Sequence, residues 1–346
     1  MYLRLKGALL AAAAALALPL AAQGEGVPAP RKAAAKKSPE RAELAETDRA
    51  PRKLPGGWTL KWHDEFNGSK LDTTKWQCEQ GTVRNKGASH VYVDDCVEVK
   101  NGMLILHSKA KDTPNPVAGK AGVPAWDSDR AVAPFASGSV TTRGRVTFSP
   151  PGRLEFRARI PKAKGVWPAI WTMHVNSYGW PANGEIDILE HISQEPNTVH
   201  SVFRWGQKGL QRGDREKTED HITRIPDFSK EFHTYVLEWD KSMMRILIDD
   251  KEVGKIDIAQ AEYPNGDNPL LTPCYIIMNT AIGGSGTWAE APNPAHYPVQ
   301  FEIDYVRFYA KSGGSADAHK SGSAGKSSPE HSKKQSRTKG AKKIKR

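Results

Sequence analysis

Short runs in which apolar and polar residues alternate recur along the chain from Trp58 onward, and they are typical of β-strands. In GRLEFRARIP, residues 152–161, every second residue from Leu154 to Ile160 is apolar and the residues between them are charged. Successive side chains of a strand point to opposite faces, so this period of two predicts a half-buried strand. The segments EFHTYVLEWD, MRILID, CYIIMNTAI and FEIDYVRFYA share this β-branched and aromatic composition. No amphipathic helix longer than two turns is evident, so we expect an all-β domain of two packed sheets.

Turn signals and long polar stretches separate these runs. Asn101-Gly102 and Asp249-Asp250-Lys251 favour tight turns between strands. Residues 112–136 and 206–230 are rich in Pro, Gly and charged residues, and the sequence predicts that both are long loops. Such loops either shape a binding site or are variable surface insertions, and both interpretations stay open here.

The two ends of the 346-residue chain differ from its middle. Residues 1–23 place Arg4 and Lys6 ahead of an Ala/Leu run, which is the layout of a secretory signal peptide. The run is shorter than the roughly 20 residues of a membrane span, so export with cleavage is favoured over an uncleaved anchor. We therefore expect a secreted or periplasmic protein. Residues 24–54 are predicted to be a disordered Pro/Ala/charged linker, 55–311 the folded domain, and 312–346 a disordered basic tail.

The formal net charge of +11 comes mainly from these ends. Residues 311–346 hold 11 Lys or Arg against 2 acids, and residues 27–54 hold 8 against 4. The folded domain is therefore near neutral, and no specific nucleic-acid binding is expected of it. The basic tail is interpreted either as a contact to an anionic cell surface or as a solubilising segment. We expect the protein to be a monomer.

The chain has three cysteines, Cys78, Cys96 and Cys274. Cys78 and Cys96 flank a short strand-like stretch and would be able to pair in an oxidising compartment, which would leave Cys274 free. Their spacing matches no zinc-binding pattern.

The segment GEIDILEHI, residues 184–192, carries three acids among β-branched and large apolar residues. In a regular strand Glu185 and Asp187 share one face, and Glu190 falls on the other. A β-bulge at Ile188 or Leu189 would return Glu190 to the face of the other two acids. Carboxylates brought together in this way can divide the work of glycosidic bond cleavage, one as an ionised group and another as a proton donor. The alternative is that they are solvent-facing acids of an edge strand.

Tryptophans gather just before the acids in KGVWPAIWTMHVNSYGWPANGEIDILE. Trp167, Trp171 and Trp180 offer apolar ring faces on which sugars stack, and the acids and Asn183 offer hydrogen bonds to hydroxyl groups. Trp180, in a Gly-Trp-Pro turn beside the acids, is the best platform candidate, whereas Trp167 is also compatible with a structural role.

Five motifs in order, WPAIW, GWPANGEIDILE, FHTYVLEW, NTAIGG and DYVRFY, resemble glycoside hydrolase family 16 in its ExDxxE form. The resemblance runs from about Trp58 to Tyr309 and is greatest to the laminarinase-like endo-β-1,3-glucanases. It implies a β-jelly-roll of two antiparallel sheets with a concave substrate cleft and a retaining mechanism. It also implies that Glu185 is the nucleophile, Glu190 the acid/base and Asp187 the assisting carboxylate, with no cofactor required for catalysis.

The resemblance also assigns substrate and metal contacts. It implies that Asn85, Asn279 and Trp288 contact the polysaccharide. Further positions, Glu65, Gly102 and Asp304, match those that hold a structural calcium ion, which is optional in the family.

Two departures from the family pattern affect the expected substrate. KGASHVY keeps Tyr92 but not the Glu and Gln of the usual Glu-x-Gln-x-Tyr stretch, and TVHSVFRWG has Arg204 in place of a second His. A cationic Arg204 in the cleft would favour an acidic or sulfated sugar. β-1,3-Glucan remains the leading expectation, with a galactan hydrolase of the agarase, porphyranase or carrageenase type as the alternative enzyme. A non-catalytic glucan-binding protein on the same fold is the alternative outside catalysis.

Overall fold

The computed structural model describes residues 52–81, 84, 86–128, 130–206 and 217–318. All of them belong to one compact unit, Thr47–Arg346. The predicted signal peptide, most of the linker and most of the basic tail lie outside the described residues. No helix among the residues described is long and apolar enough to cross a membrane.

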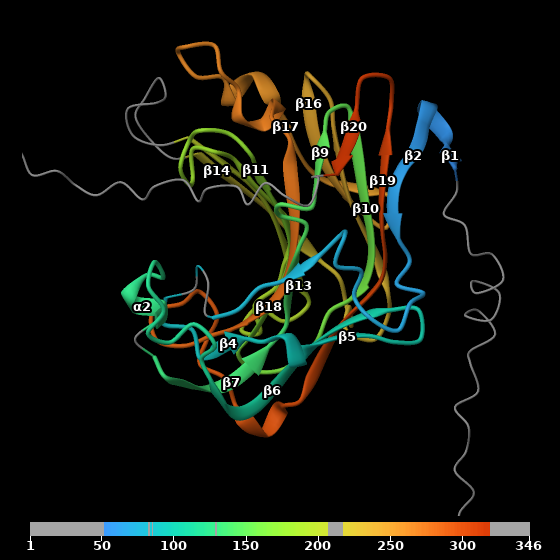
Figure 1. Cartoon of the computed structure of the whole chain (residues 1–346). Helices are drawn as coiled ribbons and strands as arrows, with labels where there is room; N and C mark the ends of the chain where they lie inside the picture. The colour runs from blue at the N-terminus through green and yellow to red at the C-terminus, as the bar shows by residue number, and fades with distance from the viewer. Residues whose placement is uncertain (1–51, 82–83, 85, 129, 207–216, 319–346) are drawn as a thin grey trace, which may run out of the picture. The chain divides into compact units, whose positions relative to one another are not determined.

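An eleven-stranded sheet forms one layer of the domain, and in Figure 1 its strands β10, β19 and β2 run side by side. All of its pairings are antiparallel except the one between β4 and β7, which is parallel. Its order is β17 (Lys251–Asp257), β16 (Met243–Ile248), β15 (His233–Trp239), β10 (Gly152–Arg159), β19 (Val299–Ala310), β6 (Leu104–Pro114), β7 (Val132–Ser137) and β4 (His90–Tyr92), with β1 (Lys53–Leu54), β2 (Trp58–Asp64) and β5 (Val97–Val99) attached beside this path.

A nine-stranded antiparallel sheet forms the second layer. Its order is β14 (Lys217–Arg224), β13 (Thr198–Trp205), β12 (Glu185–Glu190), β11 (Val166–His174), β18 (Cys274–Ile282), β8 (Ser139–Thr141) and β3 (Gln77–Cys78), with β9 (Val146–Ser149) and β20 (Ser315–Ala318) attached beside it. The described helices are short: η1 (Pro55–Gly57), η2 (Asp94–Cys96), α2 (Ala125–Ser128), η3 (Ile258–Ala261), η4 (Pro269–Leu271) and η5 (Pro294–His296). The predicted all-β fold of two sheets is thus confirmed.

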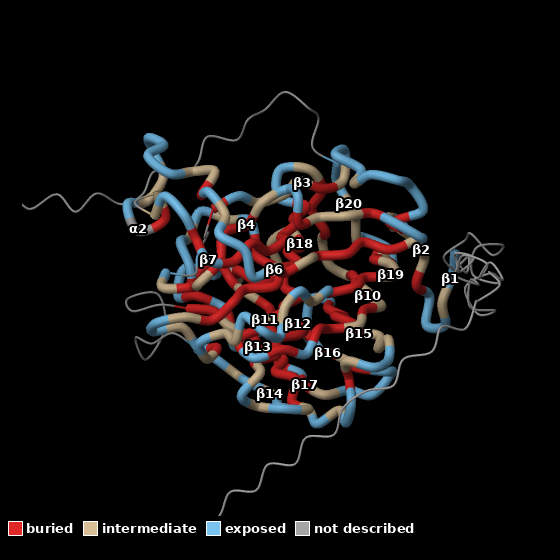
Figure 2. The backbone as a smooth tube through the Cα atoms, turned by 90° about the horizontal axis from the view of Figure 1, so that it is seen from below, coloured by how far each residue is buried: buried red, intermediate tan, exposed pale blue. Residues whose placement is uncertain are grey.

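The core lies between the two sheets and is built by the alternation seen in the sequence. Leu154, Phe156 and Ala158 of β10 are fully buried in one apolar cluster with residues of both sheets. Figure 2 shows buried stretches of both sheets in the middle of the molecule, with exposed segments around them. Burying a side chain such as Leu or Phe contributes about 1.5–3 kcal/mol, so this period-two pattern is the main reason that the chain forms a sandwich.

Both predicted tight turns are present. Asn101 and Gly102 have positive φ angles of 55° and 71° and connect β5 to β6. Asp249 and Asp250 have φ angles of 48° and 62° between β16 and β17. Asn, Asp and Gly tolerate this left-handed conformation better than other residues, which is why the turn signals could be recognised.

Three sequence predictions about segment boundaries are corrected. The folded domain exceeds 55–311, because β1 pairs with β2 and β20 pairs with β9. The predicted loop 206–230 contains β14, and the predicted loop 112–136 contains the end of β6 and the start of β7. The end of β6 and strand β14 are mostly polar, and their backbone pairing stabilises them without an apolar stripe that a sequence would reveal. β7 does bury Ala133 and Phe135, but its apolar residues are few and lie next to a Pro- and Gly-rich stretch.

The Cys78–Cys96 disulfide was a wrong prediction, because both side chains are free thiols in the structure. Cys78 lies in β3, which pairs with β8 of the nine-stranded sheet. Cys96 is buried at the end of η2, directly before β5 of the eleven-stranded sheet. Their closeness in sequence therefore does not place them in one sheet.

Candidate active site

The three acids of GEIDILE lie on one face of β12 because a β-bulge interrupts the strand. Toward β11 the pairing steps from Asp187 directly to Leu189, so Ile188 is the extra residue. Toward β13 the register shifts at the same place, between Asp187 and Glu190. The inserted residue returns Glu190 to the face that carries Glu185, which confirms the predicted bulge.

The opposite face of β12 is buried between the sheets. Ile186, Ile188 and Leu189 are all 0% exposed and belong to the main core. The strand is therefore anchored by its apolar residues, and its acids are held toward the other side of the sheet. This is the physical answer to the mixture of acids and apolar residues in the segment.

The acids open into a cleft of about 830 Å³ on the nine-stranded sheet. Its floor includes Ala169, Trp171 and Met173 of β11. Together with Ile277 of β18 they form an apolar cluster separate from the main core. The indole N–H of Trp171 donates to Asn279 Oδ1 at 2.8 Å, and this bond fixes the orientation of the ring. A concave, largely apolar floor with a few carboxylates is suited to a sugar chain.

Glu185 has partners that favour its charged form. Trp180 donates its indole N–H to Glu185 Oε2 at 2.9 Å. Arg204 Nε lies 3.5 Å from Glu185 Oε1, and its guanidinium carbon is 5.7 Å from the centre of the Trp180 ring. A neighbouring cation and a hydrogen-bond donor both stabilise a carboxylate over a carboxylic acid.

The surroundings of Glu190, in contrast to those of Glu185, favour its protonated form. Burial and the charge of Glu185 raise the pKa of Glu190 to about 7, against a hydrogen bond from Trp167 that lowers it. That bond joins Trp167 Nε1 to Glu190 Oε1 at 2.8 Å. Glu190 thus retains its proton close to neutral pH, which a proton donor requires.

Asp187 lies between the two glutamates in the strand and is only 4% exposed. Burial raises the pKa of Asp187 well above its usual range, and the nearby charges of Glu190 and Glu185 raise it further. A protonated Asp187 is able to donate a hydrogen bond to a neighbouring carboxylate. Three carboxyl groups in one buried site therefore carry fewer than three negative charges at neutral pH.

Aromatic side chains stand on both sides of the acids. Trp180 is 55% exposed, and Trp288 is 39% exposed. Trp288 contacts the edge of Trp167, with ring centres 5.6 Å apart, and contacts His200 at 4.8 Å. Exposed rings in a cleft that also holds acids are typical of sugar-binding platforms.

The predicted site residues are brought together almost completely. Every predicted catalytic and substrate-binding residue except Asn85 lines this cleft. Asn85 lies outside the described residues. Trp167, for which a structural role was also considered, contacts Glu190 directly.

Several lining residues were missed by sequence reasoning. Thr218 and Asp220 come from β14, which the sequence presents as a loop. Arg84, Arg143 and Tyr275 also line the cleft. Of these, only Tyr275 had a signal that could have identified it, because it is four residues before Asn279 and this even spacing places both on the same face of β18.

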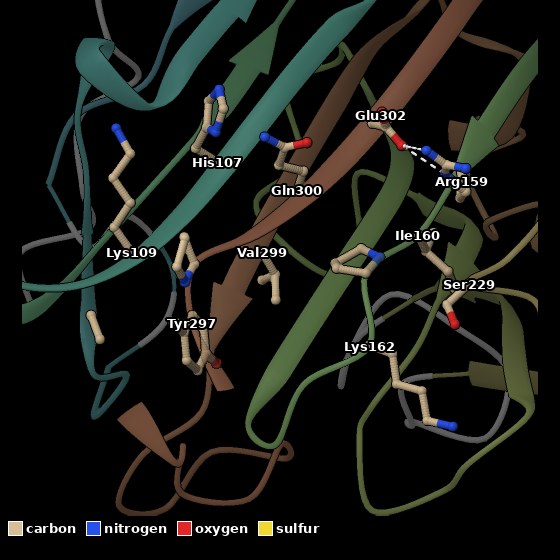
Figure 3. A pocket seen from close by; sticks show the side chains of 13 residues that line it. His107, Lys109, Arg159, Ile160, Lys162, Ser229, Tyr297, Val299, Gln300 and Glu302 are labelled. Atoms are coloured by element: carbon tan, nitrogen blue, oxygen red, sulfur yellow. Dashed lines mark hydrogen bonds and ion pairs between the residues drawn. The ribbon is translucent and has the colours of Figure 1, made fainter. Parts of the chain in front are cut away.

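A second pocket, of about 660 Å³, lies on the eleven-stranded sheet among residues of β6, β10 and β19 (Figure 3). His107 and Lys109 of β6 and Gln300 of β19 line it, and Arg159 is paired with Glu302. Glu302 is the only acid among its lining residues. It therefore lacks the pair of carboxyl groups that glycosidic bond cleavage uses.

The residues predicted to bind calcium do not fit that ion in this structure. The carboxylate of Glu65 accepts two hydrogen bonds from Arg307, at 2.9 and 2.8 Å. Asp304 accepts one from Arg157 at 2.6 Å. Both carboxylates are thus neutralised by arginine, and no cluster of three or more His, Cys, Asp or Glu suited to a metal occurs among the residues described.

Comparison with curated proteins gives two relatives of similar identity. Glucan endo-1,3-β-glucosidase A1 of Niallia circulans is 31% identical over 272 residues, which cover 73% of this chain and 38% of that protein. A β-glucanase of Rhodothermus marinus is 31% identical over 280 residues, covering 76% of this chain and 87% of that protein. The chain thus spans less than half of the first relative and most of the second.

A solved structure reported as "Prominent members of the human gut microbiota express endo-acting O-glycanases to initiate mucin breakdown" is also similar. It is 43% identical with a TM-score of 0.71, and the match covers 76% of this chain and 94% of that chain. The model for glycosyl hydrolases family 16 matches residues 85–307. Since this match covers more than half of the chain and contains the whole carboxylate site, the protein belongs to glycosyl hydrolases family 16.

Proposed function

We propose that this family 16 glycoside hydrolase cleaves internal bonds of a β-linked polysaccharide, and that its substrate is a β-1,3-glucan. The observation that carries the proposal is the bulge that gathers Glu185, Asp187 and Glu190 on the floor of one cleft. The names of the two curated relatives, an endo-1,3-β-glucosidase and a β-glucanase, support the substrate.

The reaction is a double displacement with net retention at the anomeric carbon. Glu185, which contacts Arg204 and Trp180, attacks the anomeric carbon as the carboxylate, and Glu190 donates its proton to the departing glycosidic oxygen. A water molecule then attacks the anomeric carbon of the glycosyl–enzyme intermediate and releases Glu185, while Glu190, now a base, takes a proton from that water. Asp187, protonated because its pKa is raised, lies between the two glutamates, where its one proton is available for a hydrogen bond to one of them.

An extended cleft fits an endo-acting enzyme. The lining residues run from Asp220 of β14 across β13, β12 and β11 to Tyr275 of β18, so a sugar chain crosses the strands of the sheet. Trp180 and Trp288 stand where sugars on either side of the cleaved bond would stack.

The test is product analysis of the purified protein against laminarin, lichenan, agarose, porphyran, carrageenan and mucin O-glycans, with Glu185→Gln as the blank. We expect wild type alone to release short β-1,3-linked oligosaccharides from laminarin, with the β-anomer formed first by proton NMR. Absence of new reducing ends from every polysaccharide would overturn the proposal.

A second candidate is endo-hydrolysis of galactose-containing O-glycans. It is favoured by the 43% identity to the structure reported with endo-acting O-glycanases that initiate mucin breakdown. Both candidates use the same carboxylates and differ in the sugars that the cleft accepts. In the same test, release of oligosaccharides from mucin O-glycans but not from laminarin would select the second candidate.

A further inference from the structure

The cleft floor contains a row of paired residues that extends from Glu185 across the sheet. Glu185 pairs with Met173 of β11, and Met173 pairs with Tyr275 of β18. β8 ends at Thr141, which pairs with Ile277, and Arg143 follows in the turn after β8, beside Tyr275. Neighbouring strands are about 4.8 Å apart, so Tyr275 lies two spacings, or roughly 10 Å, from Glu185 along this row, with Arg143 beyond it.

Arg143 differs from the other two arginines of the cleft in its partners. Arg84 donates to both carboxylate oxygens of Glu79, at 2.7 and 2.6 Å, and Arg204 lies against Glu185. Arg143 is exposed, and no carboxylate of a described residue lies within 4.0 Å of its guanidinium nitrogens. Among the described residues Arg143 thus forms no direct ion pair, and the one acid whose charge it influences, the buried Glu79, is itself bound by Arg84.

Tyr275 sets the position of this cation. The guanidinium carbon of Arg143 lies 5.9 Å from the centre of the Tyr275 ring, within the range of a cation–π contact. Tyr275 itself packs against the apolar floor cluster of the cleft. A guanidinium held over an aromatic ring beside the cleft can bind an oxygen-rich anionic substituent of a sugar that lies on the cleft floor.

The two ends of the cleft have opposite electrostatic character. At the β14 end, Asp220 lines the cleft and contacts His200 Nδ1 at 2.9 Å. At the β18 end, Arg143 and Arg84 both line it. A negatively charged sugar substituent is therefore repelled near Asp220 and attracted near Arg143.

We infer that the Arg143–Tyr275 end of the cleft is a subsite for a sugar that carries an anionic substituent, either a sulfate ester or a carboxylate. This inference rests on the proposed function, because it requires that a glycan crosses the strands in this cleft. It transfers to Arg143 the role that the sequence suggested for Arg204, whose guanidinium is held by Glu185. It applies equally to a β-1,3-glucan backbone with acidic substituents and to an acidic galactose-containing glycan.

The test compares kcat/KM for laminarin, lightly sulfated laminarin and lightly carboxymethylated laminarin of the same chain length. The readout is kcat/KM for each charged substrate divided by kcat/KM for neutral laminarin. It is measured in wild type, Arg143→Gln and Arg224→Gln. Arg224 is an exposed arginine of β14 that does not line the cleft, so it matches the change in net charge.

We expect Arg143→Gln to lower the ratio for at least one charged substrate by about fivefold, as expected for a partly exposed ion pair, and Arg224→Gln to leave it unchanged. A drop for both derivatives assigns general anion binding, and a drop for one identifies sulfate or carboxylate as the preferred group. Equal ratios in wild type and Arg143→Gln would overturn the inference.

A binding experiment separates this inference from the proposed function. Glu190→Gln and the double variant Glu190→Gln/Arg143→Gln are titrated by calorimetry with neutral and charged laminarin oligosaccharides. If wild type cleaves no polysaccharide but the double variant loses about fivefold in affinity for the charged ligand only, the subsite stands and the proposed hydrolysis fails. Equal affinities of the two variants for the charged ligand would overturn the subsite.

Discussion

Trp167 donates its indole N–H to Glu190 Oε1 at 2.8 Å, from the strand next to the one that carries the acid. The bond stabilises the ionised carboxylate and so opposes the effect of burial, which raises the pKa of Glu190 to about 7. Trp167 therefore acts as a positioning residue that also limits how far the pKa rises. The bulge in β12 makes this contact possible, because it turns Glu190 to the face of β11 that presents Trp167.

The first prediction concerns the pH profile. Because Glu190 must be protonated to act as the acid, kcat/KM should fall as the pH rises through about 7. The profile is measured with laminarin oligosaccharides from pH 4 to pH 9, after the protein has been shown to stay folded over this range. A profile that stays flat from pH 6 to pH 9 would remove Glu190 from the role of acid.

The second prediction uses Trp167→Phe. Loss of the N–H donor removes the contribution that lowers the pKa of Glu190, so the alkaline limb of kcat/KM should move to higher pH. Trp180→Phe is the matched control, because its N–H bonds Glu185 instead, at 2.9 Å. We expect it to lower activity without moving the alkaline limb. The same shift in both variants would contradict a specific role of Trp167.

The third prediction separates the two glutamates by chemical rescue. Glu185→Ala should lose activity by roughly 10⁴-fold or more on every substrate, because the nucleophile is gone. Glu190→Ala should lose about 10²–10⁴-fold on natural glycans but far less on an aryl glycoside with a good leaving group, which needs no proton. Added azide should restore turnover of that aryl glycoside by Glu190→Ala and yield a β-glycosyl azide. An α-azide from Glu190→Ala would reverse the two assignments.

Much of the fold and of the carboxylate site could be predicted because both depend on local periodicity. The alternation in residues 152–161 and the turns at Asn101 and Asp249 are readable within ten residues. The bulge could be deduced from the spacing of Glu185 and Glu190. The two acids can act on one sugar only if they share a face, and a regular strand places them on opposite faces unless a residue is inserted. In these cases sequence neighbours are also neighbours in space.

The parts that escaped prediction depend on contacts between distant segments. In strand β14 every residue except the exposed Ile222 is polar, so its pairing with β13 could not be anticipated. Arg143 reaches the cleft through its position beside Tyr275, more than 130 residues later in the chain. The arginine partners of Asp304 and Glu65 escaped prediction for a similar reason, since Arg157 and Arg307 come from β10 and β19, far from the carboxylates in sequence.

The fourth prediction concerns stability. The pKa of Glu190 is about 7 in the folded protein and has an ordinary value of 4.5. Between these pH values the folded protein keeps a proton that the unfolded chain has lost, so the free energy of unfolding falls as the pH rises from 4.5 to 7. In Glu190→Gln this fall in the free energy of unfolding is absent, because the amide does not titrate. The amide oxygen still accepts the hydrogen bond from Trp167. Urea unfolding should show similar stability of both proteins at pH 4 and a variant more stable by about 2–3 kcal/mol at pH 8. A variant less stable than wild type at pH 8 would mean that the Glu190 side chain is not destabilised by burial.

The last prediction concerns the loop that carries Trp288. Gly165 has a φ angle of 87°, and a Cβ added there would lie 2.4 Å from the Cα of Pro292, in the segment that follows Trp288. The carbonyl of Gly165 accepts a hydrogen bond from Gly283 N at 2.8 Å. Gly165 is thus held against the loop both at its start, near Gly283, and beyond Trp288, at Pro292.

Gly165→Ala should therefore cost roughly 3 kcal/mol in the free energy of unfolding, from the left-handed backbone and the backbone overlap together. Gly119→Ala is the matched control, because Gly119 also has a positive φ angle, 67°, but a Cβ there meets nothing within 4 Å. It should cost only about 1 kcal/mol. Because the overlap with Pro292 displaces the loop, Gly165→Ala should also raise KM more than it lowers kcat, since Trp288 contacts the sugar away from the carboxylates. Equal costs in the two variants, with KM unchanged, would show that the loop moves freely around residue 165.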